Sequence, residues 1–132
     1  MSIEEAQRET SAVDAMLEAI EAGDMERLRR CFAPNARFWH SHDRLEQNID
    51  EVLQLLGAFC AASTVRSYED RRSTSVGAEA FLRHTLTATL HSGRRVEIPT
   101  MMCVQLGSDG LVQRIDEYFD SRALDPVFAE IG

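Results

Sequence analysis

The chain has 132 residues, a formal net charge of -8, 44% hydrophobic residues and 27% charged residues. This length and composition are typical of one globular domain, so we expect residues 1–132 to form a single domain. The acidic charge argues against a nucleic-acid partner, because phosphates attract basic surfaces. The chain starts with a polar, acidic segment and has no apolar run long enough to cross a bilayer. We therefore expect no membrane partner and a cytoplasmic location.

The first half of the chain is predicted to be helical. Apolar residues at helical spacing indicate a first helix over 13–20 and a second over 25–32, and a short strand follows at 36–40. A third helix carries a clear apolar stripe from 49 to 60, and Asn48 begins a sequence that resembles a capping box.

The second half is predicted to be a sheet. Strands are expected at 64–76, 80–90, 94–106 and 111–120, joined by short glycine-containing turns, with a tail helix at 123–131. The expected fold is α+β, with three N-terminal helices on a curved, mostly antiparallel sheet. Such a sheet wrapped around helices makes a cone-shaped barrel, whose mouth suits a small, mostly apolar molecule.

Strand alternation sorts the side chains into two faces without saying which face is inside. In the strand at 80–90, Arg83 and Thr85 share one face, and Leu82 and Leu86 share the other. The leucine face is apolar enough to be core, but it is also suitable as a dimer interface on the outer side. In the second case the pocket would be lined by Arg83, Thr85, Glu117 and His40, an ionisable cluster of the kind found at catalytic sites.

Three local strings resemble a known family. They are Ala-Ile-Glu-Ala-Gly-Asp at 19–24, Cys-Phe-Ala-Pro-Asn-Ala at 31–36 and Ile-Asp-Glu-Tyr-Phe-Asp at 115–120. In this order and spacing the chain resembles the nuclear-transport-factor-2-like superfamily, in its SnoaL-like, limonene-epoxide-hydrolase-like and ketosteroid-isomerase-like branches. The resemblance covers nearly the whole chain. It implies a cone-shaped α+β barrel that is usually a homodimer through its sheet, with Arg83, Thr85 and Glu117 facing inward.

The resemblance to limonene-epoxide hydrolase also reveals departures from that enzyme. Its Asp-Arg-Asp triad corresponds here to Thr85, Arg83 and Glu117, and the Tyr and Asn that hold its water correspond to Phe38 and His40. Thr85 cannot act as a carboxylic acid and Phe38 cannot hold water, so this mechanism is disfavoured. In ketosteroid isomerase, the position of His40 is occupied by the aspartate that moves the proton.

The resemblance thus predicts an enzyme that performs acid–base proton transfer, such as isomerisation, cyclisation or dehydration, with no cofactor and no metal. His40 is expected to be the acid/base, Glu117 a partner base, and Arg83 their orienter or an oxyanion donor. The expected substrate-binding residues are Phe38, Trp39, Phe81, Thr85, Met102 and Phe119. Two alternatives remain: a non-catalytic module for ligand binding or dimeric assembly, and an epoxide hydrolase with a degenerate triad.

Overall fold

A computed structural model describes residues 3–131, with side chains from residue 12 onward. The helices are α1 (Ile3–Ala22), α2 (Met25–Arg30), α3 (Ile49–Ala62), a 3-10 turn η1 (Ser121–Leu124) and α4 (Asp125–Ile131). The strands are β1 (Phe32–His40), β2 (Glu46–Gln47), β3 (Ser63–Val76), β4 (Glu79–Leu90), β5 (Arg95–Leu106) and β6 (Val112–Phe119). The predicted α+β architecture is confirmed, and the four long strands begin and end within one residue of the predicted limits.

The six strands form one sheet in the order β2-β1-β6-β5-β4-β3. The strands β3 to β6 are an antiparallel meander, and β1 adds to β6 in parallel. Three local predictions were wrong. The second helix, predicted to reach residue 32, ends at Arg30. The first strand starts at Phe32 rather than at residue 36, because a register irregularity lets it continue through Pro34. The loop predicted at 41–47 contributes the short strand β2, which is paired with β1.

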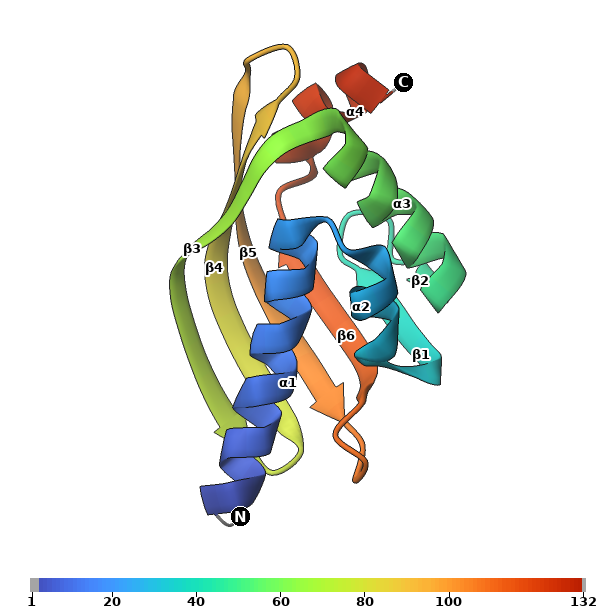
Figure 1. The fold of residues 1–132 in the computed structure, drawn as a ribbon, viewed down its shortest axis with the longest axis vertical. Coiled ribbons are helices and arrows are strands. Elements are labelled where there is room, and N and C mark those ends of the chain that lie inside the picture. The colour runs from blue at the N-terminus through green and yellow to red at the C-terminus, as the bar shows by residue number, and fades with distance from the viewer. Residues whose placement is uncertain (1–2, 132) are drawn as a thin grey trace.

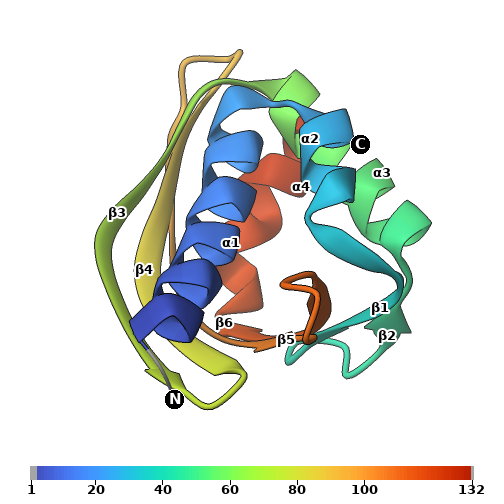
Figure 2. The same cartoon turned by 60° about the horizontal axis from the view of Figure 1, so that its bottom comes forward.

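The sheet curls around the helices and forms an unclosed cone (Figures 1 and 2). Helix α1 runs along the concave side of the meander, α3 lies beyond α2 on the β1 side, and α4 packs against α3 near one end of the cone. The expected cap at Asn48 is present, since its side chain accepts from the Glu51 amide and the Glu51 carboxylate accepts from the Asn48 amide. Within residues 3–131 no helix is both long and apolar enough to span a membrane.

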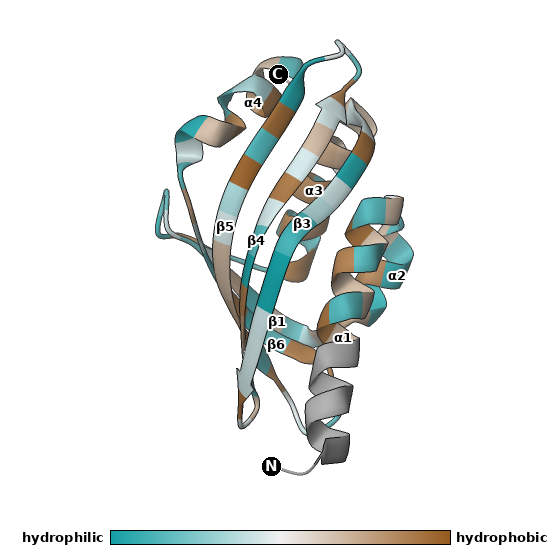
Figure 3. Cartoon of the chain, turned by 90° about the vertical axis from the view of Figure 1, so that its left-hand side faces the viewer, coloured by the Kyte–Doolittle hydropathy of each residue, from teal (hydrophilic) through white to brown (hydrophobic). Residues whose placement is uncertain are grey.

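The apolar face of β4 is the concave face. Leu82 and Leu90 are buried, whereas Phe81 and Arg83 are exposed on the convex side. Apolar and polar residues alternate along the strands, as the colours of Figure 3 show. Burying a leucine contributes about 1.5–3 kcal/mol, whereas a buried arginine needs an ionic partner. The prediction that Arg83 and Thr85 face inward is therefore wrong.

A bulge interrupts the edge strand β3. Glu69 pairs with Thr85 and Arg72 pairs with Arg83, so residues 70 and 71 lie opposite His84 alone and β3 has one extra residue there. Asp70 adopts a φ of 54°, the left-handed region that aspartate tolerates better than most residues. Because one residue is added, the alternation along β3 shifts by one position beyond the bulge, and Arg72 points to the convex side like its partner Arg83.

Candidate functional site

A cavity of about 350 Å³ lies between the concave face of the sheet and the helices α1, α3 and α4. Its wall is mostly aliphatic and aromatic, which is usual for small-molecule sites. The polar side chains that line it come from β1, β2, β3, β4, β5, β6 and the loop after β1: His40, His42, Asp43, Gln47, Tyr68, His84, Thr100 and Glu117. The cavity therefore combines an apolar volume with a few polar groups in fixed positions.

His40 and Glu117 face one another on this wall. They are partners across the parallel β1–β6 ladder, and the Nε2 of His40 lies 3.8 Å from the Oε2 of Glu117. Their side chains are 15% and 27% exposed, and both line the cavity. The two groups thus face one another inside a largely apolar space.

Burial shifts the proton affinity of both groups. Desolvation raises the pKa of Glu117 from its ordinary value of 4.5 to about 7. Desolvation also lowers the pKa of His40, with a further lowering from His42 and a smaller opposing effect of Asp43. Near neutral pH the Glu117 carboxyl group is therefore present in both protonation states beside a mainly neutral imidazole. Such a pair can accept a proton and return it.

Tyr68 on β3 and His84 on β4 form a second polar group in the cavity. Their rings meet edge to face with centroids 4.9 Å apart. Burial raises the pKa of Tyr68 well above its ordinary value, and the negative charge of Glu117 raises it further. Burial lowers the pKa of His84 to about 4, with a smaller contribution from Arg71. At neutral pH, Tyr68 is thus a hydroxyl donor and His84 a neutral imidazole.

Two polar atoms on the cavity wall are buried without a hydrogen-bond partner in the described part of the chain. They are the Oε1 of Gln47 and the Nδ1 of His84. A buried polar atom without a partner costs about 1–3 kcal/mol, so both atoms are available to a polar group of a bound molecule.

The rim of the cavity is aromatic on one side. The ring of His42 lies 5.2 Å from that of Phe119, and the ring of His40 lies 6.1 Å from the same side chain. On the other side α4 contributes Phe128 and Ile131, which line the cavity and are 44% and 40% exposed. The opening is thus bordered by aromatic and apolar side chains.

The predicted site residues divide into two groups. His40, Glu117, Phe38, Met102 and Phe119 all line the cavity. Their roles stay predictions, but the structure brings them together.

The other four predicted residues lie on the convex side, outside the cavity: Arg83, Thr85, Phe81 and Trp39. The first three alternate with buried Leu82 along β4. Trp39 alternates with Phe38 and packs edge to face on Tyr118, with centroids 5.3 Å apart. Glu117 therefore lies beside His40 and not beside Arg83.

Sequence reasoning missed Tyr68 and His84. His84 carried a usable signal, since a histidine between Leu82 and Leu86 is a titratable group on an apolar face. Tyr68 gave little signal, because its strand is polar on both faces.

Within the described residues, no three histidine, cysteine, aspartate or glutamate side chains are grouped as a metal site would require.

Comparisons with known proteins identify the fold family. The solved structures with the same fold include a candidate polyketide cyclase from Xanthomonas campestris pv. campestris (TM-score 0.77, 17% identity, covering 97% of this chain and 99% of that one). They also include an LEH-like epoxide hydrolase from M. tuberculosis (TM-score 0.74, 16% identity, covering 95% of this chain and 90% of that one). A third is PrhC from Penicillium brasilianum NBRC 6234 (TM-score 0.78, 15% identity, covering 95% of this chain and 88% of that one). At these identities the likeness demonstrates a shared fold.

No curated protein sequence matches this chain. The family model for the SnoaL-like domain matches residues 13–115, well over half of the chain. The match runs from α1 into β6 and includes β1, β3, β4 and β5. The chain therefore belongs to the SnoaL-like domain family.

Proposed function

We propose that this protein is a cofactor-independent enzyme that moves a proton on a small, neutral, mostly apolar substrate with a carbonyl or hydroxyl group. The observation that carries the proposal is the contact between His40 and Glu117, at 3.8 Å, on the wall of an apolar cavity. The raised pKa of Glu117, about 7, suits a general base at neutral pH.

In this mechanism the Glu117 carboxylate accepts a proton from the carbon next to a carbonyl group. The C–H electron pair moves into the ring or chain, and negative charge builds on the carbonyl oxygen. Tyr68 donates a hydrogen bond to that oxygen, because its phenol stays protonated at neutral pH. Glu117, with His40 beside it, returns the proton to a second carbon in isomerisation, or to a departing hydroxyl group in dehydration.

The charge of the cavity supports a neutral substrate. Among the described residues that line it there is no lysine or arginine, and Asp43 and Glu117 are both acidic. A carboxylate or phosphate group would meet like charge without a compensating cation, which is unfavourable in a low-dielectric space. Isomerisation, cyclisation and dehydration of uncharged molecules fit this environment.

The two alternative functions have less support. An epoxide hydrolase that uses an Asp-Arg-Asp triad needs an arginine in the cavity, whereas Arg83 lies on the convex side. A non-catalytic binding module would use the same apolar cavity, with His40 and Glu117 as a structural pair. The two unpartnered polar atoms and the shifted pKa of Glu117 favour the catalytic proposal.

We also propose that the protein is a cytoplasmic homodimer that associates through the convex face of the sheet. Phe81, Met101 and Tyr118 are 39%, 52% and 53% exposed there, and several large apolar side chains exposed on one face are typical of an interface. Sedimentation velocity at micromolar protein tests the dimer.

The test of the function is deuterium incorporation from D2O into a panel of neutral cyclic ketones, followed by mass spectrometry. We expect wild type to accelerate exchange beside the carbonyl of at least one ketone, and Glu117→Gln and His40→Gln to lose most of that acceleration. Glu97→Gln removes an exposed carboxylate outside the cavity and is the matched control. Equal exchange by wild type and Glu117→Gln would contradict the proposal.

A further inference from the structure

A row of ionisable side chains leads from Glu117 to the rim of the cavity. The ring of His40, whose Nε2 lies 3.8 Å from the Oε2 of Glu117, is 5.9 Å from the ring of His42 between centroids. The Nε2 of His42 lies in turn 3.5 Å from the Oδ2 of Asp43. The side chains of His40, His42 and Asp43 are 15%, 27% and 35% exposed, so access to solvent increases along the row.

The turn after β1 holds the outer half of this row in place. The Ser41 amide donates to the Glu117 carbonyl at 2.9 Å, which ties the start of the turn to β6. The Oδ1 of Asp43 accepts from the Leu45 amide at 3.0 Å, while its Oδ2 is the oxygen next to His42. The two rim side chains are therefore positioned by the fold itself.

The members of the row are electrostatically coupled. Desolvation is the main cause of the lowered pKa of His40, but His42 lowers it further and Asp43 raises it. A histidine can take up a proton at one ring nitrogen and release one from the other, which suits it to pass protons near neutral pH. The row thus has the chemistry as well as the geometry of a proton path.

A bound substrate would close the direct route between Glu117 and the solvent. Glu117 lines the cavity, and an apolar molecule in that volume excludes the water with which the carboxyl group could otherwise exchange its proton. The contact between Glu117 and His40 is made within the wall, across the β1–β6 ladder. It therefore remains available when the cavity is filled.

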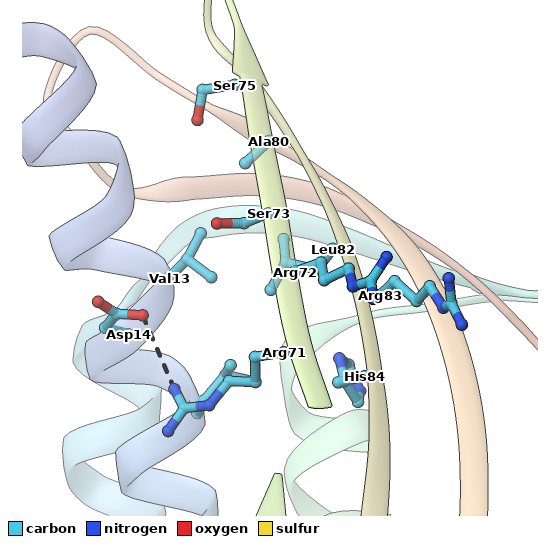
Figure 4. Close-up of a pocket in the computed structure, with 11 residues that line it drawn as sticks. Val13, Asp14, Arg71, Arg72, Ser73, Ser75, Ala80, Leu82, Arg83 and His84 are labelled. Carbon is cyan, nitrogen blue, oxygen red and sulfur yellow. Dashed lines mark ion pairs between the residues drawn. The ribbon is translucent and has the colours of Figure 1, made fainter. Parts of the chain in front are cut away.

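The opposite end of the cavity is less suited to proton transfer. There Tyr68 contacts His84, and the charged group that acts on His84 is Arg71. Figure 4 shows Arg71 turned toward α1, where its guanidinium lies 3.8 Å from the Asp14 carboxylate. An arginine keeps its proton in proteins and cannot pass one on.

We propose that His42 and Asp43 relay protons between Glu117 and the solvent while a substrate occupies the cavity. The inference rests on the proposed function, since it takes Glu117 as the base. Glu117 gives the substrate proton to the Nε2 of His40, and the imidazolium releases the proton on its other nitrogen to His42. His42 then passes a proton through Asp43 to water. The carboxylate of Glu117 is restored and one proton reaches the solvent, and the reverse steps bring solvent hydrogen to the substrate.

The test is the rate of deuterium uptake from D2O by the ketone that wild type exchanges fastest, at fixed pD and increasing imidazole concentration. Wild type should be insensitive to imidazole, because its own relay is present. His42→Phe keeps a ring against Phe119 and should slow uptake about tenfold in dilute buffer, with recovery as added imidazole replaces the relay. Asp43→Asn keeps the bond to the Leu45 amide and should slow uptake less, since His42 itself reaches the solvent.

Asp109→Asn is the matched control and should exchange at the wild-type rate. The Oδ1 of Asp109 accepts from the Leu111 amide at 3.0 Å, the same local contact that Asp43 makes, but in the β5–β6 turn outside the cavity lining. A wild-type rate in His42→Phe, or a loss that imidazole does not restore, would overturn the relay and leave the proposed function standing. The absence of uptake by every ketone with wild type would overturn both.

Discussion

The Nε2 of His40 lies 3.8 Å from the Oε2 of Glu117, and the two residues are partners in the only parallel strand pair of the described sheet. A parallel ladder places the ends of β1 and β6 at the same edge, so both side chains enter the cavity at one level. This relationship joins a histidine and a glutamate that are far apart in the sequence.

The first prediction concerns the pH dependence of stability at Glu117. Its pKa rises from 4.5 to about 7 on folding, so the folded protein binds this proton more tightly than the unfolded chain. The resulting stabilisation is present below pH 4.5 and is lost as the pH rises through 7, a change of roughly 3 kcal/mol. The free energy of unfolding of Glu117→Gln should therefore rise by about that much relative to wild type as the pH increases from 4 to 8. Urea unfolding across this range measures it, and a constant difference would contradict the prediction.

The second prediction concerns His84, whose effect has the opposite sign. Its pKa falls from 6.5 to about 4 on folding, so stabilisation is present above pH 6.5 and is lost as the pH falls toward 4. His84→Phe keeps a ring against Tyr68 and removes the titration. We expect it to lose less stability than wild type between pH 6.5 and pH 4, by roughly 3 kcal/mol in urea unfolding.

The third prediction concerns the hydroxyl group of Tyr68. Tyr68→Phe keeps the aromatic contact with His84 and removes only the proposed donor to the substrate oxygen. We expect ketone deuterium exchange to fall about 100-fold, as when one donor to a developing oxyanion is lost, with little change in the free energy of unfolding. Tyr118→Phe on the convex side is the matched control. A Tyr68→Phe variant as active as Tyr118→Phe would remove Tyr68 from the mechanism.

The fourth prediction concerns Arg83, which faces away from the cavity. Because its side chain is exposed on the convex side, Arg83→Gln should leave ketone exchange within about twofold of wild type. Its unfolding free energy should change by less than about 0.5 kcal/mol, as for most surface substitutions. A large loss of exchange in this variant would mean that Arg83 reaches the substrate after all.

Much of the fold could be read from the sequence because local signals decide it. Alternation and glycine turns gave the limits of β3 to β6, and the Asn48 cap gave the start of α3. The choice of the inner face could not be read, because period-two alternation is symmetric between the two faces. Leu82 and Arg83 are adjacent, so a shift of one residue exchanges core for surface.

The candidate site was predictable only in part for the same reason. His40 and Glu117 lie on strands whose inward face was assigned correctly. On β4 the resemblance placed Arg83 inside the cavity, whereas the next residue, His84, is the one that lines it. Tyr68 depends on how β3 pairs with β4 beside the bulge at residues 70 and 71, and such a long-range register has no local signature.

The central claim is that His40 and Glu117 hold an exchangeable proton in an apolar cavity. An NMR titration that follows the Glu117 side-chain carbonyl carbon and the His40 ring tests it most directly. We expect a Glu117 pKa near 7 and a His40 pKa below its ordinary value of 6.5. His40→Gln should alter the titration of Glu117, and Glu117→Gln should alter the titration of His40. A Glu117 pKa near 4.5 together with a His40 pKa near 6.5, both unaffected by the partner's substitution, would contradict it.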